Sequence, residues 1–244
     1  MSAIYRRELM SYFASPIGYV FSAIFFAISG VSFVWTTIGS GSTDTSSYFS
    51  VLLLFYVVLI PLLTMKLLSE EKKLGTEQLL LTSPVSLMGV ICAKFFAAFT
   101  IFALTLCTSA LVNMFSLYSV AKAQEYVIPN MNIPTFLGCV LGVLLIGAAF
   151  ISIGLFISSL TENQIISAVV SIGVFALIMA STAFAAGIRD NEVLRVIIKW
   201  FSVMDRFTAF GRGVFDITAL IYYISITTVF LFLTVRVYEK RRWE

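Results

Sequence analysis

The sequence predicts an all-α membrane protein with six transmembrane helices, and three observations support this prediction. Of its 244 residues, 59% are hydrophobic and only 12% are charged, whereas soluble domains are about 45–50% apolar and about 25% charged. Six stretches without a charged side chain are long enough to cross a bilayer, which takes about 20 residues. Basic residues are distributed unevenly between the two sides that such a topology defines. Lipid is therefore the solvent for most of this chain.

Each charge-free stretch is expected to hold one helix, because a charge at the bilayer centre costs roughly 2.5–3.5 kcal/mol. The stretches are 9–43, 45–65, 95–121, 126–161, 163–188 and 217–235. None of them holds two helices comfortably. We therefore expect helices near 17–38, 48–68, 90–117, 134–159, 164–186 and 215–237.

An even number of spans puts both termini on the same side of the membrane, and the basic residues indicate which side that is. The terminal side receives ten of them: Arg6, Arg7, Lys66, Lys72, Lys73, Lys94, Arg236, Lys240, Arg241 and Arg242. The opposite side receives six: Lys122, Arg189, Arg195, Lys199, Arg206 and Arg212. Cytoplasmic loops carry the excess of Lys and Arg, so we expect both termini to be cytoplasmic.

The first polar element is the N-terminal segment, residues 1–16, which we expect to form an interfacial helix ahead of a six-span domain at 17–244. Tyr12 and Phe13 share its apolar face, and Arg6 and Arg7 face the lipid headgroups. Pro16 then permits a turn into the first span. Two interpretations remain open, a fixed anchor and a helix that moves with the first span.

The second polar element, about residues 66–83, is expected to form a helix on the cytoplasmic side. Leu67, Leu74 and Leu81 recur every seven residues and therefore share one face of that helix. Charged side chains cover most of the remainder, and Pro84 ends the helix before the chain re-enters the membrane. The apolar stripe needs a partner, which is either the bilayer surface or a groove on another protein.

The third polar element is the external segment of about residues 187–213. An amphipathic spacing is formed by Val193, Val196, Ile197, Trp200, Phe201 and Met204. This segment either lies on the outer leaflet or forms a partly re-entrant lid over a central pathway, with Arg206, Arg212 and Asp216 pairing at its rim. The residues of such an external gate would be Trp200, Asp205, Arg206, Phe210, Arg212 and Asp216.

Several classes of chemistry are excluded by what the sequence lacks. It contains no histidine, no GxxxxGK[ST] or GxGxxG motif for nucleotides and no GxSxG motif. The three cysteines lie in apolar runs without CxxC spacing, so no metal site is expected. The net charge of +3 is too small to indicate a nucleic-acid partner. The spans also show no buried ionisable residue of the kind that an ion-coupled carrier needs, so the driving energy is expected to come from elsewhere.

Residues 70–84, EEKKLGTEQLLLTSP, resemble the E-x(4)-GT-x-E-x-LL-x-(T/S)-x-P segment of ABC-2 type permeases, and Lys94-Phe95 resembles the start of their third span. Three further stretches are similar to the family: Arg7-Glu8-Leu9 through Ser15-Pro16, residues 154–164, and the end of the chain from Asp205 to Trp243. Within the family, the similarity is greatest to the branch that contains the gliding-motility permease GldF.

This resemblance implies the ABC-2 (type V exporter-like) permease fold, in which two permease subunits, identical or different, bind ATP-binding cassette subunits at a bacterial inner membrane. ATP and magnesium would lie on the partner subunit, so no catalytic, cofactor or metal residue is expected here. By position, 66–83 would be the coupling helix and 187–213 the extracellular helices before the last span. Contacts to the ATPase would come from Leu67, Glu70, Glu71, Leu74, Gly75, Thr76, Glu77 and Leu81, and a second, shorter contact from Glu162 and Asn163.

The favoured interpretation is thus the permease subunit of an ABC exporter. The alternative is a scaffold that transmits ATP-driven force to an envelope partner, such as an auxiliary extracytoplasmic subunit. An enzyme acting on lipid headgroups would have only Asp205, Arg206, Arg212 and Asp216 to use, and a channel would need a charge ring that the sequence lacks. Membrane lipid is the one further partner expected, and the spans do not specify a substrate.

Overall fold

The computed structural model describes residues 2–39, 45–73, 75, 86–123, 133–187, 193, 198 and 202–243, and every regular element in these ranges is a helix. Six of the helices are long and apolar enough to cross a membrane, which confirms the predicted number of spans. They are α2 (Pro16–Phe33, continued by the π-helical turn η1, Val34–Ile38), α3 (Ser46–Thr64), α6 (Leu87–Ala123), α7 (Ile133–Leu160), α8 (Gln164–Gly187) and α11 (Ile217–Trp243).

Three shorter helices complete the described part of the chain. These are α1 (Ser2–Ala14), α4 (Ser69–Lys73) and α10 (Val203–Gly211). Ser15 is extended, with φ −96° and ψ 150°, and Pro16 then begins α2 at the position where a helix needs no N–H donor. Near the end of α3, Pro61 lies inside the helix, and a turn at residues 65–68 separates α3 from α4.

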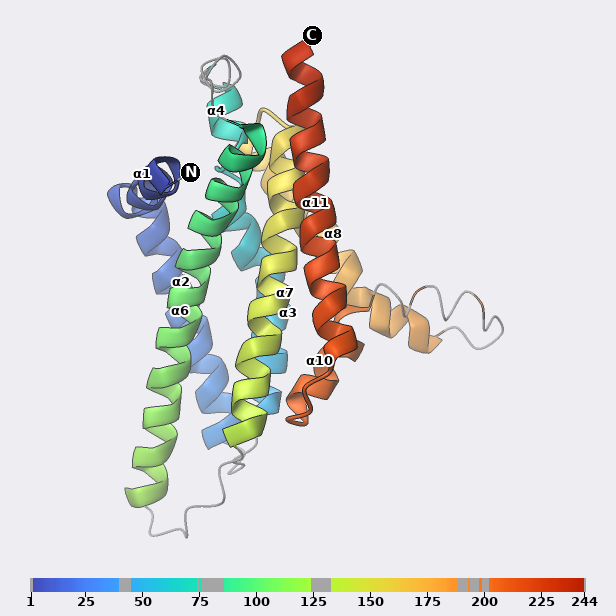
Figure 1. Cartoon of the computed structure of the whole chain (residues 1–244). Coiled ribbons are helices and arrows are strands. Elements are labelled where there is room, and N and C mark those ends of the chain that lie inside the picture. The colour runs from blue at the N-terminus through green and yellow to red at the C-terminus, as the bar shows by residue number, and fades with distance from the viewer. Residues whose placement is uncertain are drawn as a thin grey trace.

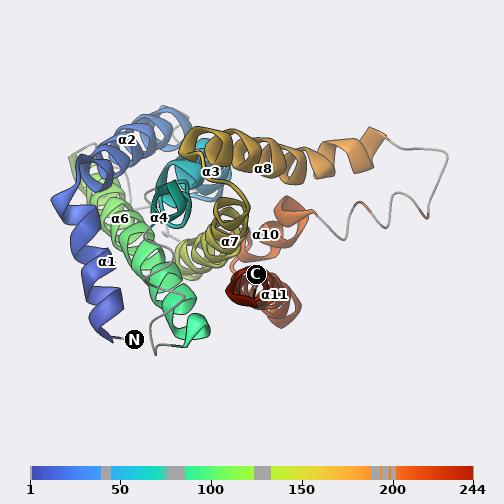
Figure 2. The same cartoon turned by 90° about the horizontal axis from the view of Figure 1, so that it is seen from above.

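Helix α7 lies at the centre of the bundle and packs against α3, α6, α8, α10 and α11 (Figure 1). We call the end of the bundle that carries α1, α4 and the last turns of α11 the terminal end, because both chain termini lie there (Figure 1). Viewed from that end, α1 runs across the bundle beside α6 instead of along the spans (Figure 2). The terminal end therefore gathers helices from the beginning, middle and end of the sequence.

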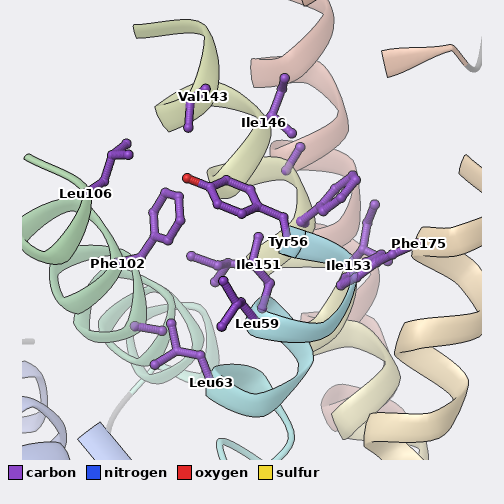
Figure 3. Packing of buried hydrophobic residues seen from close by; sticks show 14 of the residues in the cluster. Tyr56, Leu59, Leu63, Phe102, Leu106, Val143, Ile146, Ile151, Ile153 and Phe175 are labelled. Carbon is purple, nitrogen blue, oxygen red and sulfur yellow. The ribbon is translucent and has the colours of Figure 1, made fainter. Parts of the chain in front are cut away.

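Aromatic side chains fill much of the core between α2, α3, α6 and α7. Tyr56 of α3 lies among Phe102, Val143 and Ile146, which come from α6 and α7 (Figure 3). The Tyr56 and Phe102 rings meet edge to face with their centroids 5.2 Å apart. Phe150 of α7 stacks on Phe175 of α8, with centroids 4.4 Å apart. Such contacts add about 0.5–1.5 kcal/mol per pair beyond the area they bury.

Two glycines let α7 approach its neighbours closely. A Cβ atom at position 154 would lie 2.9 Å from the Cβ of Thr64 on α3, and one at position 147 would meet the ring of Phe102 on α6. In both places the added Cβ atom would be closer to its neighbour than real Cβ atoms come, so only glycine permits this packing. The outward faces of α2 and α8 instead expose large apolar side chains such as Val31 and Ile165, as expected for surfaces that contact lipid.

We predict that Gly154→Ala lowers the thermal unfolding midpoint in detergent, because the added methyl group must push α3 away from α7 at a cost of about 1–3 kcal/mol. The control is Gly30→Ala in α2, where an added Cβ meets nothing within 4 Å. That variant should keep the midpoint of the wild type or raise it slightly. Equal midpoints for both variants would contradict the packing described.

Candidate functional site

Four charged side chains from three helices meet at the terminal end, and we call them the four-charge cluster: Arg7 and Glu8 of α1, Glu71 of α4 and Lys94 of α6. The Nζ atom of Lys94 lies 2.8 Å from Oε1 of Glu71 and 3.2 Å from Oε1 of Glu8. It also donates a hydrogen bond of 3.0 Å to the carbonyl oxygen of Leu67. The Lys94 side chain is only 1% exposed, so these contacts replace its hydration completely.

The burial of Lys94 corrects the sequence-based view that the spans hold no buried ionisable residue. Lys94 lies inside the third span, about two turns from its beginning at Leu87. Burying one ammonium group without a partner costs several kcal/mol. Two carboxylates and a carbonyl oxygen offset that cost here, and they come from segments distant in the sequence. Lys94 is therefore a structural ion-pair residue that requires α1 and α4 to be in place.

Arg7 closes the cluster on its outer side. Its Nη2 atom lies 2.9 Å from Oε1 of Glu8 and 3.4 Å from Oε1 of Glu71. The hydrogen bond to Glu8 raises the pKa of the Arg7 guanidinium, so this residue stays charged at every accessible pH. A cavity of about 360 Å³ lies beside the cluster and is lined by α1, the turn between α3 and α4, α4 itself and Lys94.

Two tyrosines attach α1 to the spans. The Tyr12 hydroxyl donates a hydrogen bond of 3.0 Å to the carbonyl oxygen of Leu63 in α3. Burial raises the pKa of Tyr12, so its hydroxyl remains protonated as this bond requires. The Tyr5 hydroxyl lies 2.9 Å from Oγ1 of Thr100 in α6. Helix α1 is thus held by specific polar contacts to two spans in addition to the four-charge cluster.

The turn between α3 and α4 is fixed by a serine from the end of α7. The Ser158 hydroxyl oxygen accepts hydrogen bonds from the backbone N–H groups of Leu68, at 3.2 Å, and Ser69, at 3.1 Å. The same hydroxyl lies 3.4 Å from the carbonyl oxygen of Met65, to which it donates. One fully buried side chain therefore satisfies the backbone where α4 begins.

The turn at residues 161–163, between α7 and α8, approaches α4 directly. Lys72 Nζ lies 3.3 Å from Oε1 of Glu162, whose side chain is 73% exposed. From the last turns of α11, Arg241 donates a hydrogen bond of 3.0 Å to the carbonyl oxygen of Ser159. Helix α4 and the turn at 161–163, which belong to the two segments predicted to contact a partner, thus lie side by side.

The structure places the predicted ATPase-contact residues in two groups. In the first group, Leu67 is buried and Glu71 points inward to Lys94, so these two side chains are directed into the protein and not toward a partner.

The second group is at least partly exposed. Glu70 is partly exposed and pairs with Lys66 at 3.3 Å. Gly75 is exposed and has a left-handed backbone, with φ +69°, and Asn163 is exposed beside Glu162. The remaining members, Leu74, Thr76, Glu77 and Leu81, lie outside the described residues.

At the opposite end of the bundle, α10 turns back among the spans. Its N-cap Ser202 accepts a hydrogen bond of 3.2 Å from the Asp205 N–H, and lies 2.7 Å from the Thr182 hydroxyl of α8. The Tyr223 hydroxyl of α11 donates a bond of 2.9 Å to the carbonyl oxygen of Val203. Tyr223 lies about 9 Å along α11 from its first residue, so α10 begins inside the helix layer and not at its edge.

The predicted external gate residues are not joined as expected. Within the described ranges no ion pair links Arg206, Arg212 and Asp216, so their predicted mutual pairing is wrong. The Asp216 carboxylate instead accepts the Thr218 N–H at 2.8 Å and begins α11, while the Arg206 guanidinium stacks on a ring of α11 and Arg212 is exposed. Asp205 is exposed.

Phe210, another predicted gate residue, is fully buried. Its carbonyl oxygen would lie 2.7 Å from a Cβ atom at Gly138 of α7, and its ring packs against Gly142. Phe210 therefore anchors α10 to α7. The sixth gate residue, Trp200, lies outside the described part of the chain, and so does most of the predicted amphipathic helix at 193–204, of which only positions 193, 198 and 202–204 are described.

Sequence reasoning missed a buried polar network between α2, α3 and α6. The Ser29 hydroxyl lies 2.7 Å from the Tyr48 hydroxyl, and the amide of Asn113 donates to both, at 3.1 and 3.0 Å. Ser109 contacts Ser29 as well. The signal was present as an asparagine in an apolar helix, because such a group needs hydrogen-bond partners inside the membrane.

The described part of the chain is a bundle with six helices long enough to span a membrane, an ion-paired cluster at its terminal end and the short helix α10 packed among the spans at the other end. A comparison with family models gives its class: residues 26–238 match the ABC-2 family transporter protein. The match covers most of the chain, so this protein belongs to the ABC-2 transporter family. It is the membrane component of such a transporter, and the ATPase is a separate partner subunit. A search of curated proteins finds no match.

We predict that Lys94→Met destabilises the protein by about 3–5 kcal/mol, because the largely buried Glu8 and Glu71 carboxylates would then share one cation, the mostly exposed guanidinium of Arg7. Thermal unfolding in detergent would measure the effect. In the triple variant that adds Glu8→Gln and Glu71→Gln, the loss should be largely recovered, since no unpaired carboxylate remains. A single variant as stable as the wild type would show that the cluster has no structural role.

Proposed function

We propose that this chain forms the membrane pathway of an ABC exporter and couples to its ATPase through α4 and the turn at 161–163. The observation that carries the proposal is the set of polar contacts converging on α4. Glu71 joins α4 to Lys94 of α6, and Lys72 joins it to Glu162. Ser158 of α7 holds the turn just before it. A displacement of α4 would therefore act on α1, α6 and α7 together.

The surface offered to the ATPase would be the exposed side of this assembly. Lys73, Gly75 and Glu162 are exposed there, and Glu70 is partly so. The left-handed conformation at Gly75 turns the chain at the end of α4, where a residue with a Cβ atom is strained. Leu74, Thr76, Glu77 and Leu81 would extend this surface, and Asn163 would lie beside Glu162.

The sidedness of the proposal follows from the basic residues. The terminal end carries Arg7, Lys66, Lys72, Lys73 and the basic last turn of α11, so it would face the cytoplasm of a bacterial inner membrane. A second permease subunit, identical or different, would complete the transporter. The segment 187–213 would then form its extracellular helices.

To test the docking surface, we would co-purify the permease with its neighbouring ATPase and measure ATP hydrolysis. The charge reversals Lys73→Glu and Glu162→Arg should reduce association and ATPase stimulation at least tenfold, because both side chains are exposed at the proposed contact. The control is Arg212→Glu, a charge reversal on an exposed side chain at the opposite end.

Full association of the double variant would contradict docking at α4. Failure of the wild-type permease to bind any ATPase would contradict the coupled function itself. Equal losses in the control variant would indicate a general defect in assembly and would likewise exclude the proposed surface.

A second function is favoured by the similarity of residues 70–84 to the gliding-motility branch of the family. In that case the same coupling would transmit force to an auxiliary envelope subunit, and no solute would cross the membrane. The two functions differ in one observable property. An exporter moves substrate into sealed vesicles with its ATPase alone, whereas a force-transmitting scaffold hydrolyses ATP productively only when the envelope subunit is bound.

A further inference from the structure

An apolar cavity of about 400 Å³ lies between α7, α8 and α11, away from the coupling elements. We call it the α7–α8–α11 slot. Its walls are the side chains of Phe150, Phe156, Ile178, Ile226 and Phe230 among others, and Val203 and Tyr222 also line it. A cavity of this size lies within the range of ordinary ligand sites, which is about 300–1,000 Å³.

The slot runs along the spans. On α11 its lining extends from Tyr222 to Phe230, and eight residues of helix correspond to about 12 Å. Tyr222 lies near the beginning of α11, at the end of the bundle opposite the termini, whereas Phe230 lies near the middle of that helix. The slot is thus parallel to the acyl chains of a surrounding bilayer and begins in the same leaflet as α10.

A cation lies against Tyr222, the slot residue nearest the beginning of α11. The guanidinium carbon of Arg206 is 3.7 Å from the centre of the Tyr222 ring, which is a close cation–π contact. Among the residues that the structure describes, no carboxylate pairs with Arg206 and no acceptor takes its N–H groups, although Asp205 and Asp216 lie nearby in the sequence. Arg206 therefore presents a planar set of donors that suits a phosphate group.

The chemistry of the slot favours an acyl chain as its occupant. Its walls are almost entirely apolar, so they exclude a polar solute. An acyl chain is narrower than an α-helix, which is about 10–12 Å across with its side chains. The Arg206 cation beside Tyr222 complements a phosphate headgroup, whereas a second apolar helix offers it no acceptor.

We propose that the α7–α8–α11 slot binds one acyl chain of a phospholipid from the surrounding bilayer, while Arg206 binds the phosphate of the same lipid. A lipid bound in this way would join α10 to the spans, because its phosphate would contact Arg206 of α10 and its acyl chain would lie between α7, α8 and α11. The site is separate from the proposed coupling surface at the terminal end, and the binding test on the purified permease does not depend on an ATPase.

The test compares three additives on the purified full-length permease in detergent. These are dioleoyl phosphatidylglycerol, galactosyl dioleoylglycerol, which has the same chains but no phosphate, and glycerol phosphate, which has the headgroup but no chains. We expect only the first to raise the thermal unfolding midpoint, by roughly 5 °C at about 100 times its Kd. Stabilisation by either of the other two, or none by the phospholipid, would overturn the proposal.

Two variants with matched controls locate the site. Arg206→Gln removes the cation, and Ile226→Trp fills the slot; each should lose at least nine-tenths of the phospholipid-dependent shift. Arg212→Gln and Ile224→Trp alter exposed side chains of the same types and should keep it. If Arg206→Gln fails to fold, Ile226→Trp alone decides, because an unchanged shift in that variant overturns the proposal.

Two further outcomes identify a different occupant. A change in oligomeric state on filling the slot would assign it to a subunit interface and overturn the proposal. Native mass spectrometry of the transporter complex should find the phospholipid still bound after ATP turnover. Its loss on turnover would make it a transported molecule and would overturn its assignment as a resident lipid.

Discussion

The buried ammonium group of Lys94 is the constraint on which the terminal end of this protein depends. A lysine in the third span has no water to solvate it, so the fold must bring carboxylates to it. It does so with Glu8, 86 positions earlier in the sequence, and Glu71, 23 positions earlier. Helices α1 and α4 are consequently placed by one electrostatic requirement, and a movement of either one affects the other.

The two ends of the bundle are held together by different kinds of contact. At the terminal end, charged and hydroxyl side chains join α1, α4, α7 and α11, where water limits the strength of each exposed pair. In the middle, aromatic rings and the close approach of α7 at Gly147 and Gly154 hold the spans. A tightly packed middle transmits small displacements without absorbing them, because close-packed interiors are not easily compressed. This division suits a subunit that receives its driving force at one end.

The far end is defined by α10, which enters the helix layer where Gly138 and Gly142 leave room for Phe210. Its deep end is held by side chains of two spans, through Thr182 and Tyr223. Arg206 is thereby held against Tyr222, which also lines the apolar slot. Helix α10 is thus an integral part of the helix packing and not a loose cover over it.

The sequence by itself determined the six spans, because a charge-free apolar run of sufficient length has no other stable environment than lipid. It also indicated the family, through the motif at residues 70–84, which the comparison over 26–238 then established at family level. Only the tertiary structure decided that Glu71 faces Lys94 and that Arg206 stacks on Tyr222 without pairing with Asp216. The physical reason is that helical periodicity specifies which residues share a face, whereas the partner of a charge depends on how separate helices pack.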